Sequence, residues 1–212
     1  MLPRVVRSAY WRLVHPILRW LGGLPSPREK ARILIEYGRR QGIATLVETG
    51  TYLGDTVAAC LPRFEHLYTI ELDEALYDAA RSRFNGHPNV TVIQGDSYTE
   101  LNRLAFEIME PALFWLDAHY CAGPTAKGPH DPPLEWELRA IVLRGKGDVI
   151  LIDDARHMGL LAGSFRQWIR RTLLRCVPPG PGYPSLQEIR QIVDERVSSF
   201  EVRRDIIRIT LA

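Results

Sequence analysis

The chain has 212 residues, of which 46% are apolar and 25% are charged. This is ordinary globular composition, too rich in apolar residues for a mainly disordered chain, and the length favours one main domain. Lysine and arginine number 27 and aspartate and glutamate 25, for a net charge of +2. Because no bulk basic field results, we expect no nucleic-acid partner.

The cysteines also exclude some classes of protein. Cys60, Cys121 and Cys176 are far apart and form no CxxC pair, so neither a disulfide scaffold nor a zinc knuckle is indicated. A reducing, cytoplasmic setting is the plain interpretation.

Residues 1–24 are predicted to be an amphipathic helical extension of a domain at 25–212. Basic residues interrupt every apolar run, so no stretch reaches the ~20 residues that span a bilayer. The helix could pack on the domain, cover its pocket, form a homodimer surface or make a weak peripheral contact with an anionic membrane.

From Pro25 onward the chain alternates between two periodicities. A capping box of Ser26 and Glu29 predicts the start of a helix that ends near Gly42. Short apolar runs typical of buried parallel strands then follow, separated by helical patterns. The runs occupy 44–48, 67–71, 90–94, 112–117 and 148–153, and the helical patterns occupy 55–63, 74–84, 98–108 and 134–144.

The C-terminal part predicts two more strands. Ser185 and Glu188 form a second capping box, on a helix that runs to about Arg196. Two strands then meet at a turn near Arg204 and Asp205. We therefore predict an α/β fold with a doubly wound, Rossmann-like sheet of seven strands, mostly parallel, whose C-terminal strand is antiparallel.

The first predicted strand leads into a glycine-containing loop. Residues 48–56 read ETGTYLGDT, which is E-x-G-x-x-x-G and not the G-x-G-x-x-G of dinucleotide loops. Glu48 would repel a pyrophosphate but favour a cationic ligand such as S-adenosylmethionine, and Gly50 and Gly54 would allow close approach of the backbone. An ordinary tight turn is the alternative. The other candidate cofactor-binding residues of the loop are Thr51, Tyr52, Asp55 and Thr56.

Acids also end the second and third predicted strands. Glu71 is placed to bind a ribose diol, although a solvated strand-end carboxylate would look the same. Asp96 and Ser97 could contact the adenine side of a nucleoside, or one of the two, Asp96 or Ser97, could simply cap the next helix.

Three more acids follow the fourth and fifth predicted strands. Asp117, Asp153 and Asp154 should meet at one sheet edge, where their charges repel unless a cation neutralises them. A hard divalent ion such as Mg²⁺ would do so. Alternatively Asp153 and Asp154 pair with Arg156 or cap a loop.

His119 is the candidate catalytic base, because an imidazole two residues after Asp117 could take a proton at neutral pH. An ordinary surface or core histidine is the alternative, and His157 is the rival base.

These residues together resemble class I S-adenosylmethionine-dependent methyltransferases. VETGTYLGDT is similar to the first motif of the family, and FWLDAHY with VILIDDAR is similar to the macrocin-type sugar and macrolide O-methyltransferases. The resemblance implies a magnesium site at Asp117, Asp153 and Asp154 and a base at His119. The glycine- and proline-rich insert between Asp117 and Asp153 departs from that group.

The resulting hypothesis is O-methylation of a small-molecule hydroxyl, with Asp117 near both cofactor and metal and His119 accepting the proton. Three alternatives stay open: an NAD(P)-dependent oxidoreductase, a catalytically silent adenosyl-binding protein, and a metal-free N- or C-methyltransferase.

Overall fold

A computed structural model of the chain describes residues 25–117, 132–158 and 182–212. The predicted N-terminal extension, His119 and most of the loop that follows it lie outside these ranges. Within them, no helix is both long enough and apolar enough to cross a membrane.

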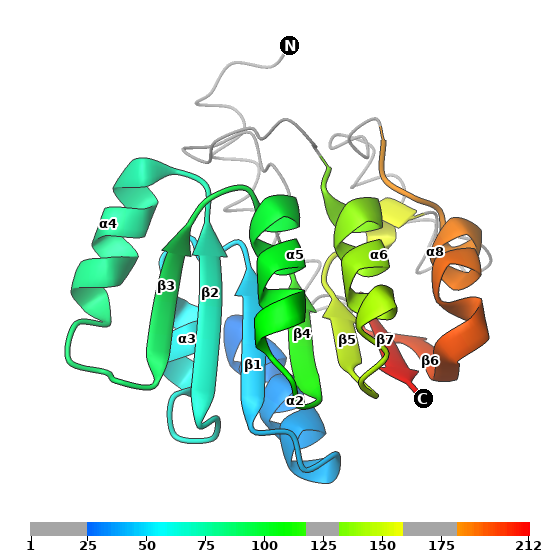
Figure 1. The fold of residues 1–212 in the computed structure, drawn as a ribbon, viewed down its shortest axis with the longest axis horizontal. Coiled ribbons are helices and arrows are strands. Elements are labelled where there is room, and N and C mark those ends of the chain that lie inside the picture. The colour runs from blue at the N-terminus through cyan, green and yellow to red at the C-terminus, as the bar shows by residue number, and fades with distance from the viewer. Residues whose placement is uncertain (1–24, 118–131, 159–181) are drawn as a thin grey trace.

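The described strands form a single sheet of seven in the order β3-β2-β1-β4-β5-β7-β6 (Figure 1). The first five are parallel, and β7 runs antiparallel to both β5 and β6. This confirms the predicted fold class. The strands are β1 (Thr45–Thr49), β2 (His66–Glu71), β3 (Val90–Gln94), β4 (Ala112–Leu116), β5 (Val149–Ile152), β6 (Val197–Arg203) and β7 (Ile206–Leu211).

Helices cover both faces of the sheet, and each face has its own apolar core. Residues of α5, α6 and α8 pack on one face, and residues of α2, α3 and α4 pack on the other. The helices are α2 (Pro27–Arg40), α3 (Asp55–Cys60), α4 (Glu74–Arg83), α5 (Ser97–Glu107), α6 (Leu134–Arg144) and α8 (Leu186–Val193), with short 3-10 turns at Ala155–Met158 and Asp194–Arg196.

The local signals in the sequence produce these elements as predicted. Both capping boxes form, Ser26 with Glu29 and Ser185 with Glu188. Arg204 and Asp205 have φ values of 50° and 66°, the left-handed pair that a tight two-residue hairpin turn requires.

The connections from β1 set the place of the site. The chain leaves β1 toward β2 and β3 on one side and later returns to β4 and β5 on the other. Ligands of open α/β sheets bind at such a reversal, outside the carboxyl ends of the strands. Apart from Asp55, which begins α3, every candidate acid of the sequence lies in one of these strands or within two residues of its end.

Candidate functional site

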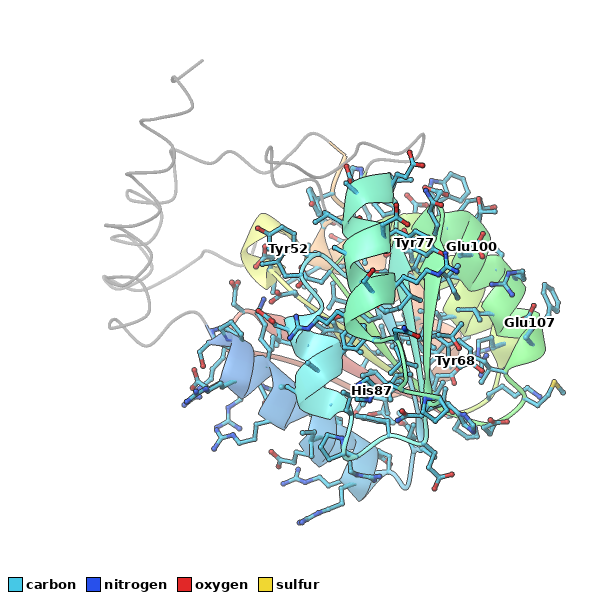
Figure 2. The ribbon with its side chains drawn as sticks, turned by 90° about the vertical axis from the view of Figure 1, so that its left-hand side faces the viewer. Tyr52, Tyr68, Tyr77, His87, Glu100 and Glu107 are labelled. Atoms are coloured by element: carbon cyan, nitrogen blue, oxygen red, sulfur yellow. The ribbon has the colours of Figure 1, made fainter. Side chains whose placement is uncertain are left out.

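The β1–α3 loop is a compact turn at the carboxyl end of β1. Gly50, Tyr52 and Gly54 all have positive φ, at 84°, 49° and 76°. A Cβ on Gly54 would lie 2.7 Å from the Phe84 ring, so both the conformation and the space demand glycine there. Tyr52, within this turn, is 49% exposed (Figure 2).

Glu48 lies beneath the loop and is enclosed, with 2% of its surface exposed. Its Oε2 accepts a hydrogen bond from Thr69 Oγ1 at 2.7 Å, and Thr69 Oγ1 is 2.6 Å from Thr51 Oγ1. Burial raises the pKa of Glu48 to about 7, against the opposing effect of the hydroxyls of Thr69 and Thr56. Glu48 therefore titrates near neutrality, and its carboxyl group is covered by the protein and not exposed to solvent.

Glu71, at the end of β2, binds the backbone of the same loop. Its Oε2 accepts from the Tyr52 backbone N–H at 2.8 Å, and its Oε1 accepts from the Asp73 N–H at 3.0 Å. Each carboxylate oxygen can accept a further bond, so capacity for a diol remains. The tie from Glu71 to Tyr52 also explains how a non-glycine residue is held at a positive φ.

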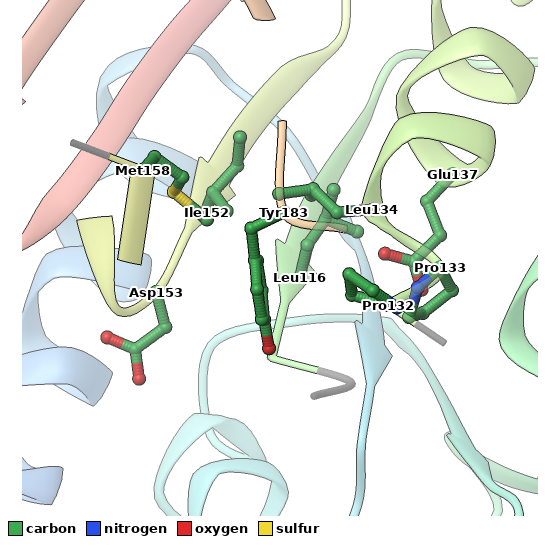
Figure 3. A pocket seen from close by; sticks show the side chains of 9 residues that line it. All are labelled: Leu116, Pro132, Pro133, Leu134, Glu137, Ile152, Asp153, Met158 and Tyr183. Atoms are coloured by element: carbon green, nitrogen blue, oxygen red, sulfur yellow. The ribbon is translucent and has the colours of Figure 1, made fainter. Parts of the chain in front are cut away.

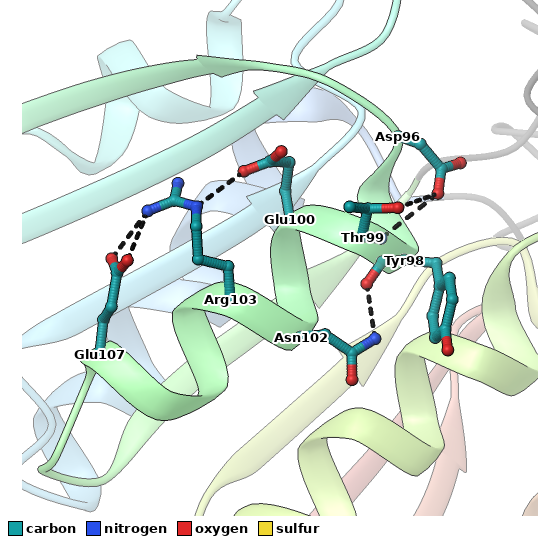
Figure 4. Close-up of polar contacts among 7 residues, drawn as sticks. All are labelled: Asp96, Tyr98, Thr99, Glu100, Asn102, Arg103 and Glu107. Atoms are coloured by element: carbon teal, nitrogen blue, oxygen red, sulfur yellow. Dashed lines mark hydrogen bonds and ion pairs between the residues drawn. The ribbon is translucent and has the colours of Figure 1, made fainter.

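Asp96 caps α5, as the more modest interpretation of the sequence foresaw. Its carboxylate accepts from the backbone N–H and the hydroxyl of Thr99, at 3.3 and 3.2 Å (Figure 4). Ser97 is buried, whereas Asp55 pairs with Arg83 at 2.8 Å on the surface. Capping fixes where Asp96 lies and leaves its contact with an adenine a prediction.

The carboxylates after β4 and β5 meet an unforeseen partner, Lys30 of α2. Its Nζ forms an ion pair with Asp153 and lies 3.8 Å from Asp117 Oδ2. Although burial favours the neutral amine, Asp117, Asp153 and Asp154 raise the pKa of Lys30, so it stays an ammonium. Burial, Asp117 and Asp154 raise the pKa of Asp153, and Lys30 opposes that shift.

As these side chains lie, they do not fit a magnesium ion. No three described His, Cys, Asp or Glu side chains lie together in a way that could hold a metal. The Lys30 ammonium is paired with Asp153 where the predicted ion would bind. The magnesium prediction stays untested, and it would require Lys30 to move.

A small pocket opens beside Asp153 (Figure 3). It lies between the ends of β4 and β5, the start of α6 and Tyr183, and its space of about 230 Å³ is partly open to solvent. Most of its walls are apolar, and Asp153, whose carboxylate is turned away from the other lining side chains and pairs with Lys30, is the acid at its edge (Figure 3). The apolar and aromatic lining residues are Leu116, Pro132, Pro133, Leu134, Ile152, Met158 and Tyr183.

Sequence reasoning therefore located the acids but missed Lys30. The signal for it was weak, a lone lysine one residue after the Glu29 of a capping box. His119 lies outside the described residues, and the side chain of His157 is likewise not described, so neither candidate base is tested.

No family model matches the chain. Ribosomal RNA small subunit methyltransferase A of Dehalococcoides mccartyi is similar to it, at 26% identity over 141 residues for strain CBDB1 and 25% for strain BAV1. The matched part is 66% of this chain and 48% of each relative, so the chain spans about half the length of the curated relatives it matches.

Solved structures match over nearly the whole chain. A methyltransferase of Podospora anserina bound to S-adenosylhomocysteine has a TM-score of 0.59 at 17% identity, covering 100% of this chain and 89% of that one. An O-methyltransferase of Bacillus cereus, also with S-adenosylhomocysteine, has 0.59 at 20%, covering 96% and 91%. TomG of Streptomyces achromogenes, with S-adenosylmethionine, has 0.58 at 16%, covering 100% and 91%. The chain thus has the fold of these proteins.

Proposed function

We propose that the chain is an S-adenosylmethionine-dependent methyltransferase that methylates a hydroxyl group of a small molecule. The observation that carries this proposal is the pair of acids beneath and beside the β1–α3 loop. Glu48 lies under the turn, and Glu71 accepts the Tyr52 backbone N–H. An N–H that binds a carboxylate is not free to bind pyrophosphate, so the loop suits a cationic nucleoside better than a dinucleotide.

In this proposal, different residues of the site bind different parts of S-adenosylmethionine. The turn of Gly50–Thr56 would hold the methionine part, Glu71 the ribose, and Asp96 with Ser97 the adenine side. S-adenosylmethionine supplies an electrophilic methyl group on a sulfonium. Alignment of an acceptor oxygen with that methyl would then account for most of the acceleration, and His119 remains the predicted proton acceptor.

One other function has an observation in its favour. The curated relatives that match in sequence are named as ribosomal RNA methyltransferases. An RNA acceptor is therefore the second candidate, although the chain's net charge of +2 gives RNA little electrostatic attraction.

Calorimetric titration with S-adenosylhomocysteine and, separately, with NAD tests the cofactor. We expect binding of the first alone, and weaker binding in Glu71→Gln because the carboxylate that anchors both loop and ribose loses one acceptor oxygen. Glu107→Gln, on the surface of α5, is the matched control and should bind normally. Binding of NAD without S-adenosylhomocysteine would overturn the proposal.

Transfer of a radiolabelled methyl group then tests the acceptor. The full chain is incubated with a panel of phenols and cyclic alcohols, and in parallel with a small-subunit ribosomal RNA transcript. Label in a small-molecule ether supports the proposal, whereas label only in the RNA assigns the second function.

A further inference from the structure

Lys30 is held at the carboxyl edge of the sheet by its own helix. It lies in the first turn of α2, where the Ser26–Glu29 capping box fixes the backbone. Arg204 of the β6–β7 turn contacts Glu29 at 3.0 Å and ties this helix end to the rest of the domain. A lysine on a rigid, capped turn loses less side-chain freedom when it pairs than one on a loop.

The Lys30 ammonium is enclosed by groups that favour a cation. It pairs with Asp153, lies 3.8 Å from Asp117, and stands 5.6 Å from the centre of the Trp115 ring. Only 22% of the Lys30 side chain is exposed. A divalent ion bound to the same carboxylates would lie against this ammonium and be repelled by it.

Asp153 borders the pocket and has an unused hydrogen-bond acceptor. Its side chain is 1% exposed, and among the described residues its Oδ1 has no hydrogen-bond partner while Oδ2 pairs with Lys30. A buried carboxylate oxygen without a donor is costly, so this arrangement points to a ligand that brings one.

We propose that Lys30 is the resident cation of this edge, in place of a divalent metal, and that Lys30 with Asp153 binds the hydroxyl of the acceptor. A hydroxyl can donate to Asp153 Oδ1 and accept from the Lys30 ammonium, which matches both groups. An acceptor that carried an ammonium group in place of the hydroxyl would be repelled by the Lys30 ammonium. The acceptor role rests on the proposed function, whereas the exclusion of metal does not.

The lining of the pocket, which is mostly apolar, limits the chemistry of the acceptor. Apolar walls favour a single ring or short chain bearing one hydroxyl over a polyhydroxylated sugar.

Binding of Mn²⁺, followed by its electron paramagnetic resonance signal, tests the exclusion of metal without cofactor or turnover. We expect no saturable binding to the wild-type chain, and a new site in Lys30→Met that Asp153→Asn removes again. Lys146→Met is the matched control and should gain none. Tight Mn²⁺ binding by the wild-type chain that Asp153→Asn abolishes would overturn the inference. A folded Lys30→Met variant that gains no Mn²⁺ site would overturn it as well. Lys30→Arg keeps the positive charge and should exclude Mn²⁺ whether or not Lys30→Met folds.

Binding of phenol and of its methyl ether, anisole, tests the hydroxyl site, with ligand-detected magnetic resonance as the readout. We expect phenol to bind the wild-type chain more tightly than anisole, and Lys30→Met to weaken phenol about tenfold without changing anisole. Equal loss of both ligands, or of neither, would overturn the hydroxyl assignment. Since neither probe needs S-adenosylmethionine, failure here is separable from failure of the proposed methyl transfer.

Discussion

Two buried ion pairs lie at opposite ends of the same sheet and differ in how completely they are satisfied. At the amino end, the side chains of Arg144 and Asp148 are both 0% exposed and pair at 2.9 Å. Arg144 also donates to the carbonyls of Ile108 and Glu110, and Asp148 accepts the Ala112 N–H at 2.9 Å. This cluster joins α6 and the starts of β4 and β5 to the end of α5.

The carboxyl-end pair is incomplete by comparison. Lys30 has one positive charge and faces three acids. The side chains of Lys30 and Asp117 are both partly exposed. Among the described residues, Asp153 Oδ1 has no hydrogen-bond donor. A saturated buried network contributes to stability and uniqueness, whereas an unsaturated one keeps capacity for a ligand. The contrast indicates that the ion pair at the amino end stabilises the fold and that the ion pair at the carboxyl end is suited to binding a ligand.

The largest expected effect is the loss of the amino-end pair. Arg144→Met leaves the Asp148 charge buried and unpaired, which typically costs about 3–5 kcal/mol of unfolding free energy. Urea unfolding measures it, and S-adenosylhomocysteine affinity of the folded variant should be unchanged. Arg139→Met, an exposed position on the same helix, is the control; a comparable loss there would remove the distinction.

Glu48 sharpens the comparison through pH. Its pKa of about 7 in the fold exceeds the ordinary 4.5, so the folded state binds this proton more tightly than the unfolded chain. Its contribution to stability is full below pH 4.5 and falls by about 3 kcal/mol as the pH rises through 7. Glu48→Gln should abolish this decline, seen as the difference between variant and wild-type unfolding curves. The exposed Glu65→Gln should not.

The same titration should appear in ligand choice, if the cofactor proposal holds. S-adenosylmethionine carries a sulfonium charge and S-adenosylhomocysteine does not, so only the first gains as Glu48 ionises. The charge of Glu71 raises the pKa of Glu48, and the charge of Lys30 lowers it. We expect the preference for the charged ligand to grow about tenfold between pH 6 and 8. A preference independent of pH, or one that persists in Glu48→Gln, would contradict the role of Glu48.

The fold was predictable because its signals are local. Apolar runs, capping boxes and the Arg204–Asp205 turn each depend on neighbours within a few residues, and the structure bears them out. The convergence of Asp117 and Asp153 followed from a rule of parallel sheets, that carboxyl ends of adjacent strands share an edge.

The charge balance of the site was not predictable in the same way. Lys30 and Asp153 are 123 positions apart, and no spacing rule connects the first turn of α2 to the end of β5. The burial of Glu48 was likewise hidden, because it depends on how α3 and the hydroxyls of Thr69 and Thr56 close over the carboxylate. Tertiary packing decides both.

The smallest effect is expected from an ion pair whose contacts are as short as those of the amino-end pair but whose side chains are exposed. Arg103 Nη1 contacts both oxygens of Glu107, at 2.7 and 2.8 Å, and Arg103 Nε contacts Glu100 at 3.0 Å (Figure 4). The Arg103 side chain is 48% exposed, so water and salt screen these charges. Arg103→Ala should change the unfolding free energy by about 0.5 kcal/mol or less, and less still at high salt. A loss approaching that of Arg144→Met would show that contact geometry, and not burial, separates the pairs of this protein.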